Sequence, residues 1–291
     1  MEISSMSSRL RRCLTVTLAV LTLVYQTRLH PQHTVDAFNI EQIVFKSRFD
    51  SIRLSTKENL SNEYGEWISS RRKATQPSSF GNSVIIIFPG AGGPDCFTSE
   101  LQETLQNDMQ ELKQDNEKFL CVWDWSEFRG NVFTAAFDSE CVGEGAAEAL
   151  DVSSKNNQLS AKITSVHSIG VSVGAFAANA FARKYKAQYP ESHVKLTLLD
   201  PFTGRGLFGP NYGRDNFGLD VDVAEQYLNT DDPVPTTNSP LPLCKVYDVT
   251  DADERNTFVP PKGESMHTWP LVYYSRYGYQ RNNQDNVIAR E

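Results

Sequence analysis

The sequence predicts an α/β domain whose central sheet is mostly parallel and carries helices on both faces. Short apolar runs of the kind that form buried parallel strands alternate with longer helical segments. Turn residues, chiefly Gly and Pro, end these runs. The alternation of strand-like and helical segments is typical of right-handed βαβ units. Nothing resembling an internal linker interrupts the pattern, so residues 38–291 are expected to form a single domain.

Five apolar runs predict strands. The first, VIIIF, ends in the turn sequence PGAGGP, and the others are also rich in β-branched or aromatic residues. The predicted strands are Val84–Phe88, Phe119–Trp125, Ile163–Gly170, Val194–Asp200 and Leu243–Val249.

Helices are expected before and between these strands. The longest has few helix breakers, and two others are rich in alanine, which favours helix formation and close packing. The predicted helices are Ile40–Arg48, Ser99–Asn116, a helix that includes Gly143–Leu150, and Val173–Tyr185.

The composition is that of a globular protein. The 291 residues are 40% hydrophobic and 22% charged, which excludes a wholly disordered chain and a small disulfide-rich scaffold. Acidic residues outnumber basic ones by 36 to 28, and the formal net charge is −8. Without a basic stripe the chain is poorly suited to bind phosphate backbones, so no nucleic-acid partner is expected.

Residues 1–37 have the features of a targeting segment. Arg9, Arg11 and Arg12 precede an uncharged run over residues 13–27, as in a secretory signal peptide. The run is short for a bilayer span, so we expect a cleaved signal, with an uncleaved membrane anchor as the alternative. Either directs the protein to the secretory pathway, to be secreted or membrane-anchored; plastid targeting is a remote alternative.

Four cysteines remain once such a signal is removed. They contain no Cys-x-x-Cys pair, so no zinc site is expected. An even number in a secreted chain permits two disulfides, with three pairings open. The four are Cys96, Cys121, Cys141 and Cys244.

The segment GVSVG at residues 170–174 has the spacing Gly-x-Ser-x-Gly, between a predicted strand and a predicted helix. In this context the serine occupies a strained turn that exposes its hydroxyl, and the next backbone N–H faces a developing oxyanion. We therefore predict Ser172 as a nucleophile and Val173 as an oxyanion donor. Ser168 lacks the leading glycine and ranks below it; a Gly/Ser-rich turn of a noncatalytic domain is the alternative.

A serine nucleophile needs a base, usually histidine, and elimination leaves one. His30 and His33 lie in the targeting segment. His167 lies within the strand that leads to the serine, and His193 opens the next strand at its far end. His267 remains, and the chain order serine, acid, histidine is that of α/β-hydrolases.

The acid has two candidate positions. Asp200 ends the strand after the nucleophile strand, where the carboxyl ends of parallel strands converge on a ligand crevice. Asp251, with Asp248 and Asp253 nearby, follows the last predicted strand, where most α/β-hydrolases carry the acid. Position alone leaves both open.

The glycine-rich loop after the first strand, Pro89–Gly92, allows close backbone approach to a ligand. We predict the Ala91 N–H as the second oxyanion donor, with Gly92 as its neighbour. The loop lacks the Lys-Ser/Thr of a phosphate-binding loop. The Gly-x-Gly-x-x-Gly spacing at 204–209 is followed by turn-forming residues rather than by an expected helix, so no nucleotide cofactor is predicted.

Five segments in order resemble the secreted lipase family that includes pancreatic lipase, lipoprotein lipase and phospholipase A1. They span roughly residues 80–280 and read IIIFPGAGG, VWDWSEFRGNVFTAAFDSECVGEGAAEAL, SVHSIGVSVGAFAANAFA, KLTLLDPFTG and HTWPLVYY. The resemblance implies an α/β-hydrolase fold, favours Asp200 over Asp251 as the acid, and makes Ser172, Asp200 and His267 a triad. It aligns Ala91 with the family's oxyanion donor.

The implied activity is hydrolysis of carboxylic esters, with lipid acyl esters or small esters as substrates, contact with a membrane or lipid surface, and no cofactor. The sequence departs from the family at Pro89, Val171 and Val173, and at Ser265–Met266, where the family has a cysteine before the histidine. No long lid and no C-terminal β-sandwich are evident. A catalytically silent lipid-binding or interaction protein, or a thioesterase or amidase with the same triad, is the alternative.

Two further features of the sequence are consistent with either a functional or a structural role. The aromatic loop at 204–219 is expected to line an acyl site, to act as a flap, or to be a plain surface loop. Four carboxylates are expected to form a solvated acidic face, with calcium binding as the alternative. They are Asp220, Asp222, Asp231 and Asp232.

Overall fold

The computed structural model of the chain describes residues 82–91, 93–111, 118–125, 135–155, 163–205, 209–234 and 237–279. The chain divides into two units, Met1–Ile52 and Arg53–Glu291, and every described residue belongs to the second. The predicted targeting segment and the predicted helix Ile40–Arg48 lie outside the described residues. Within the described part, no helix is long and apolar enough to cross a membrane.

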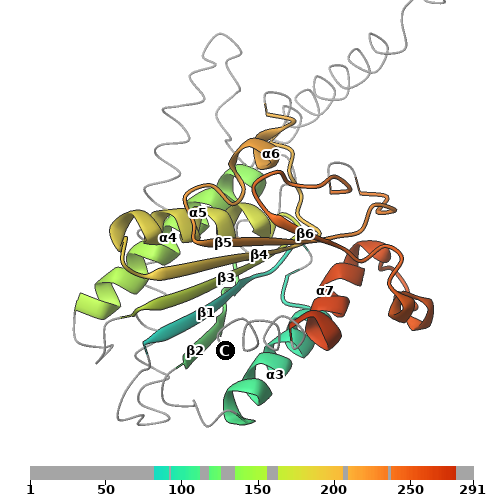
Figure 1. Cartoon of the computed structure of the whole chain (residues 1–291), viewed down its shortest axis with the longest axis horizontal. Coiled ribbons are helices and arrows are strands. Elements are labelled where there is room, and N and C mark those ends of the chain that lie inside the picture. The colour runs from blue at the N-terminus through green and yellow to red at the C-terminus, as the bar shows by residue number, and fades with distance from the viewer. Residues whose placement is uncertain are drawn as a thin grey trace, which may run out of the picture. The chain divides into compact units, whose positions relative to one another are not determined.

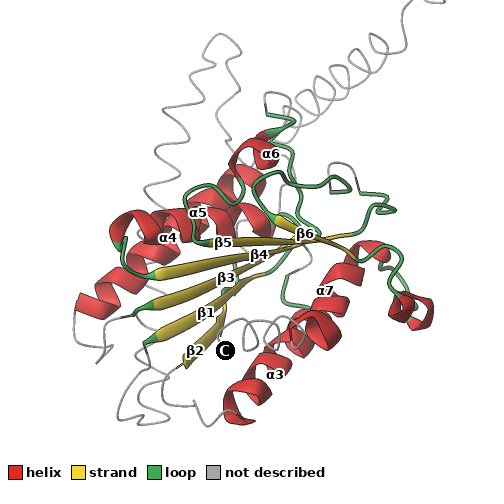
Figure 2. Cartoon of the chain, in the orientation of Figure 1, coloured by secondary structure: helices red, strands yellow, loops and turns green. Residues whose placement is uncertain are grey.

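A six-stranded sheet forms the centre of the fold, with strand order β2-β1-β3-β4-β5-β6 (Figure 1). All five neighbouring pairs are parallel, and helices alternate with strands from β1 to β5 (Figure 2). The strands are β1 (Ser83–Phe88), β2 (Lys118–Val122), β3 (Ser165–Val171), β4 (His193–Leu199), β5 (Val223–Leu228) and β6 (Lys245–Asp248). The predicted α/β class with a mostly parallel sheet is confirmed.

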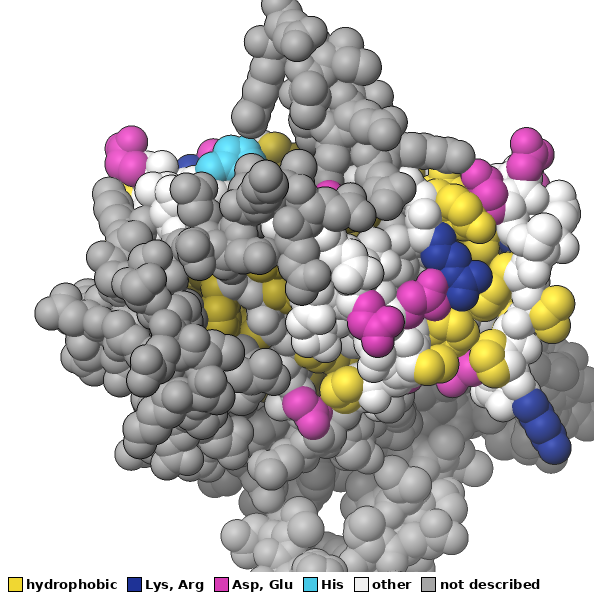
Figure 3. Space-filling model, turned by 90° about the horizontal axis from the view of Figure 1, so that it is seen from below, with side chains coloured by type: hydrophobic (Ala, Val, Ile, Leu, Met, Phe, Trp, Pro, Cys, Tyr) yellow, Lys and Arg dark blue, Asp and Glu magenta, His cyan; other side chains and the backbone are white. Residues whose placement is uncertain are grey.

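Helices cover both faces of the sheet, with α4 and α5 on one side and α3 and α7 on the other (Figure 1). Seen from below, hydrophobic side chains lie between acidic and basic ones on the molecular surface (Figure 3). The helices are α3 (Cys96–Glu111), α4 (Ala135–Lys155), α5 (Gly174–Gln188), α6 (Tyr212–Asn216) and α7 (Trp269–Tyr273), with 3-10 turns η5 (Asp253–Thr257) and η6 (Met266–Thr268) and a π turn, η7 (Tyr274–Gly278).

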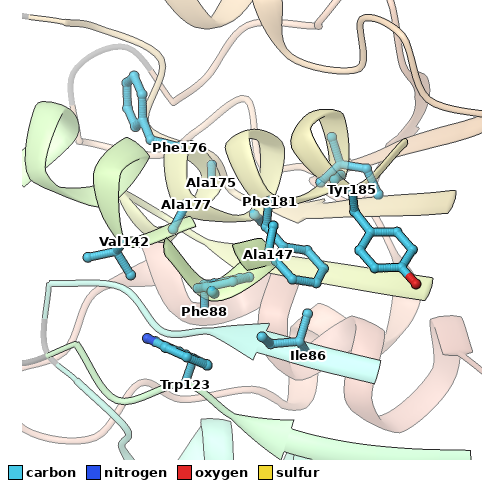
Figure 4. Close-up of a cluster of buried hydrophobic side chains, with 14 of the residues drawn as sticks. Ile86, Phe88, Trp123, Val142, Ala147, Ala175, Phe176, Ala177, Phe181 and Tyr185 are labelled. Atoms are coloured by element: carbon cyan, nitrogen blue, oxygen red, sulfur yellow. The ribbon is translucent and has the colours of Figure 1, made fainter. Parts of the chain in front are cut away.

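The apolar run of β1 fills the core on both sides because successive strand residues point to opposite faces. Ile86 and Phe88 pack toward α4 and α5, whereas Ile85 and Ile87 pack toward α3 and α7. Figure 4 shows Phe88 between Trp123 and the α5 residues that cover the sheet. Being apolar on both faces, this run forms a buried strand rather than an amphipathic one.

Small residues let α4 and α5 approach closely. A Cβ placed on Gly143 of α4 would lie 2.0 Å from the carbonyl oxygen of Ala177 in α5. Between the helices, Ser139 Oγ accepts the Ala177 N–H and donates to the Val173 carbonyl. The alanine-rich character of both segments thus serves helix–helix contact and fixes where α5 begins.

The sequence analysis missed strand β5. Its sequence, VAEQYL, contains Glu225 and Gln226, which are buried. Glu225 pairs with Lys195 of the neighbouring strand at 2.9 Å, and Gln226 accepts the Leu241 N–H at 2.8 Å. Because these partners satisfy the polar groups, a strand forms where the residue types alone did not indicate one.

The four described cysteines form no disulfide, so the predicted option of two disulfides is wrong for them. Cys121 in β2 and Cys141 in α4 are buried as small apolar residues. Burial, together with the charge of Glu225, raises the pKa of the Cys244 thiol to about 12. Cys244 is therefore held as a neutral thiol.

Candidate active site

Four polar side chains follow the strands at the carboxyl edge of the sheet. Ser172 comes directly after β3 and Asp200 directly after β4. Asp232 lies in the loop after β5, and His267 lies in η6, after β6. Since parallel strands end at the same edge of the sheet, this topology assembles groups distant in sequence.

The Ser172 backbone has a left-handed conformation, with φ of 51°. This is costly for a residue with a side chain and persists only where the surroundings impose it. Here its N–H donates to the Leu199 carbonyl at 3.0 Å, and its own carbonyl accepts the Phe202 N–H at 3.1 Å. The turn after β3 is thus hydrogen-bonded to the turn after β4.

Two glycines of the GVSVG segment are required by close contacts. A Cβ on Gly170 would lie 2.7 Å from both the Cα of Ala175 and the Cβ of Ala178. A Cβ on Gly174 would lie 2.3 Å from the Phe88 carbonyl oxygen. Gly170 lets helix α5 pack on the preceding strand, β3. Gly174 lets the first turn of α5 approach the end of β1.

The loop after β1 lies against the serine. A Cβ on Gly90 would be 3.2 Å from the Ser172 Cβ. Gly93, with φ of 90°, donates its N–H to the Gly90 carbonyl at 3.1 Å and closes a turn. The buried Trp125 donates its Nε1–H to the Pro89 carbonyl at 2.9 Å and fixes the start of this loop.

The two predicted oxyanion donors border this contact. Ala91 lies at the exposed corner of the turn closed by Gly93, and Gly92 lies outside the described residues. Val173 is 6% exposed and directly precedes α5. The β1 loop and the start of α5 thus flank Ser172.

The polar residues set aside in the sequence analysis have other contacts. His167 Nε2 lies 2.8 Å from Thr197 Oγ1 on the adjacent strand. Ser168 is fully buried and donates to the Ala178 carbonyl at 2.9 Å. His193 is exposed at the start of β4. None of these contacts involves Ser172.

Asp200 and His267 are in direct contact, with 2.9 Å between Asp200 Oδ2 and His267 Nδ1. Asp200 is 1% exposed and has φ of 45°. Its Oδ1 accepts the Asn229 N–H at 3.3 Å, and Asn229 also donates its side-chain amide to the Met266 carbonyl. Asp251, the other candidate acid, is exposed.

A second carboxylate, missed in the sequence analysis, contacts the same nitrogen. Asp232 Oδ2 lies 2.9 Å from His267 Nδ1. Asp232 is 4% exposed; its side chain accepts a hydrogen bond from Thr237 Oγ1 and the Val234 N–H at 3.1 Å. The expected solvated acidic face is therefore wrong for this residue. Its position soon after β5 was the signal, but it depends on recognising that strand.

The other three carboxylates of that group have separate partners. Asp222 pairs with Lys186 at 2.8 Å, whereas the largely exposed Asp220 and Asp231 pair with arginines. The four therefore do not converge on one point, and the calcium alternative has no common site.

The histidine and its two acids perturb one another. Burial alone would lower the pKa of His267, but its hydrogen bonds to Asp200 and Asp232 and their negative charges outweigh burial and raise it to about 9. Burial raises the pKa of Asp200 to about 7 despite its hydrogen bond to the histidine. The pKa of Asp232 is lowered because bonds from His267 and Thr237 outweigh its burial. Asp232 is thus the more readily ionised acid.

The nitrogen and carboxylate oxygens of Asp200, Asp232 and His267 all lie within 4.8 Å of one another. Such a group has suitable donor atoms for a cation. However, the 2.9 Å separations are those of N–H···O hydrogen bonds. We therefore interpret the three as a hydrogen-bonded histidine with two acids.

The loop at 204–219 contributes to the core. Phe217 is fully buried and packs edge-to-face on Phe176, and Tyr212 stacks on the same ring. Arg205 lies over the Tyr212 ring and pairs with Glu140 at 2.5 Å. A short helix, α6, begins at Tyr212, where the sequence analysis expected none. These two aromatic residues pack inward, in contrast to the side chains of a free flap.

Comparisons with known proteins add little. No family model and no curated protein matches the chain. Among solved structures, a protein provisionally described as a cell surface hydrolase of Lactobacillus plantarum WCFS1 aligns with 55% of this chain and 74% of its own, at 14% identity and a TM-score of 0.33. Similarity at this level assigns no function. The fold class rests on the sheet itself, and the secreted lipase family remains a resemblance in sequence segments.

Proposed function

We propose that the protein is a serine hydrolase that cleaves carboxylic esters through an acyl-enzyme. One observation carries the proposal: the strained turn at Ser172 is hydrogen-bonded to the strand end that precedes Asp200, and Asp200 in turn contacts His267. A serine on such a turn and a histidine oriented by a buried acid are the groups that nucleophilic catalysis requires.

In the proposed reaction His267 Nε2 accepts the Ser172 proton while Ser172 Oγ attacks the ester carbonyl carbon. The N–H groups of Val173 and Ala91 stabilise the oxyanion of the tetrahedral intermediate. His267 then donates the proton to the departing alcohol, and the acyl group stays on the serine. Water, activated by the same histidine, attacks this acyl-enzyme and releases the acid.

The substrate class within this proposal is lipid acyl esters. Its support is the ordered set of five segments resembling secreted lipases, together with the predicted signal or anchor over residues 1–37. Within this proposal the protein belongs to the secretory pathway and contacts a membrane or lipid surface. The reaction requires no cofactor.

The test is hydrolysis of p-nitrophenyl esters with acyl chains from C2 to C16 by the full chain and by Ser172→Ala. We expect turnover that is lost in this variant and retained in Ser168→Ala, which removes the neighbouring serine. Equal turnover in wild type and Ser172→Ala would overturn the proposal. No turnover on any ester would instead favour a noncatalytic lipid-binding protein, and activity confined to thioesters or amides would change the substrate class.

A further inference from the structure

We propose that His267 is positioned by two carboxylates of comparable importance, so that Asp232 is a positioning residue alongside Asp200. The kinetic consequence rests on the proposed function; the effect on the histidine itself does not.

The two contacts are equivalent in length. Each carboxylate places its Oδ2 2.9 Å from His267 Nδ1, and both acids are buried, at 1% and 4% exposure. Nδ1 carries one proton, so the bond is shared between the two acceptors or alternates between them. In either case an acceptor remains when one carboxylate is removed.

The side chains of the two acids are held mainly by different bonds, and Asn229 links the two residues: its N–H donates to Asp200 Oδ1 and its carbonyl accepts the Asp232 N–H at 3.2 Å. Asp200 is fixed by its position directly after β4, where its N–H donates to the Tyr227 carbonyl at 3.0 Å. Asp232 is held within its own loop by Thr237 and by the Val234 N–H. Replacing one acid by its amide leaves the bonds named here for the other in place, which allows either to keep the imidazole oriented.

Two anions also stabilise the protonated histidine more than one does. Among the described residues, the titratable groups in contact with His267 are Asp200, from the loop after β4, and Asp232, from the loop after β5. Arg255 of η5 pairs with Asp231 instead, and Glu264, just before η6, is exposed. Removal of either buried carboxylate should therefore make His267 less basic.

The decisive variants are Asp200→Asn, Asp232→Asn and the double variant. We expect each single variant to lose much less activity than the double variant and to shift the acid limb of the kcat/KM profile by about one pH unit to lower pH, a change of the size that one neighbouring charge produces. In the double variant neither acid fixes the imidazole tautomer, and we expect a loss of about 10³–10⁴-fold, as when a lone triad acid is replaced by its amide.

Asp231→Asn is the matched control. It removes the adjacent carboxylate, whose side chain is 65% exposed and pairs with Arg255, and we expect no shift. A readout independent of activity is the NMR titration of ¹³Cε1-labelled histidine in the full chain, with His267→Gln to assign the signal. The His267 midpoint should fall in Asp232→Asn and stay in place in Asp231→Asn.

The inference is overturned if Asp200→Asn alone loses as much activity as the double variant, or if the His267 titration is unchanged in Asp232→Asn. Should Asp232→Asn fail to fold, Asp232→Ser provides a smaller neutral replacement for the same NMR titration. If Ser172→Ala retains wild-type turnover, the proposed function fails, yet the NMR titration still decides whether Asp232 acts on His267.

Discussion

Gly174 occupies a position where three segments meet and no side chain fits. A Cβ there would lie 2.3 Å from the Phe88 carbonyl oxygen and 2.6 Å from that of Pro89. Both contacts are with backbone, so the β1 loop would have to move away from the start of α5. The absence of a side chain at Gly174 therefore sets the distance between Val173 and the loop that contains Ala91.

We expect Gly174→Ala to lower the free energy of unfolding by about 1–3 kcal/mol, the usual cost of overpacking. Alanine favours a helix over glycine by about 1 kcal/mol, so any net loss reports the clash. Displacement of one oxyanion donor should also reduce kcat, by up to about 10²–10³-fold. Chemical denaturation and ester kinetics measure the two effects; stability equal to or above wild type would contradict the predicted clash.

The ionisation of His267 couples stability to pH. Its pKa is raised from 6.5 to about 9 in the folded protein. A raised histidine pKa stabilises the fold fully below about pH 6.5, and this contribution is lost as the pH rises through about 9. Asp200 lowers the free energy of unfolding as the pH rises from 3.8 to about 7. Its pKa is raised over this interval, so the carboxyl is harder to ionise in the folded state than in the unfolded state.

We therefore expect the free energy of unfolding to fall between about pH 6.5 and 9, by on the order of 3 kcal/mol from His267. Over the same range kcat/KM should rise, since only neutral imidazole accepts the serine proton. Denaturation curves at several pH values test this, with His267→Gln as the variant in which the fall is reduced. A stability that rises across this range would refute it.

At the scale of elements, the segment after β4 is attached to α4 by one partly buried cluster. Arg205 pairs with Glu140 and lies over the rings of Phe137 and Tyr212, at 4.3 and 4.5 Å. Tyr212 also donates its hydroxyl to Glu140. This cluster holds the segment that follows Asp200 against α4, and α4 in turn packs on α5.

We expect Glu140→Ala to destabilise the protein by about 1–3 kcal/mol, because it leaves a partly buried guanidinium without its anion. Arg205→Ala in the same background should cost much less than in wild type, since the unpaired charge is then absent. A double-mutant cycle in chemical denaturant measures this coupling. Strictly additive effects would show that the ion pair does not hold the segment.

How far the sequence predicts the fold is clearest from the strands themselves. The first four strands, β1 to β4, are apolar runs bounded by turn residues, and each was predicted within a few residues of its observed position. β5 was not predicted because Glu225 and Gln226 interrupt its apolar pattern. Their partners lie on β4 and in the segment after β5, and the pattern of one strand contains no information about them.

The site shows the same limit. Ser172 could be singled out because its motif is local, and His267 because other histidines were eliminated. Asp200 was favoured over Asp251 only by the family resemblance, and the structure brings it to His267. Asp232 required knowledge of the missed strand β5. The catalytic roles of these residues remain predictions until the variants are assayed.

At the scale of the whole molecule, the four described cysteines form no disulfide, so no such bond among them holds the fold. We therefore expect the melting temperature to be the same with and without dithiothreitol. Thermal unfolding in both conditions tests this, with a thiol titration of the denatured, unreduced protein as the control. A lower melting temperature in the reductant would reveal a disulfide on which the fold depends.

The order of the strands also has a consequence during synthesis. The centre of the sheet, with β3, β4 and the turn at Ser172, is encoded well before β6 and η6. At about 5–20 residues per second, several seconds pass between the emergence of the serine and that of His267. Until η6 docks, the nascent chain exposes a serine without its base, so the catalytic function we propose would begin only when the last described elements leave the ribosome.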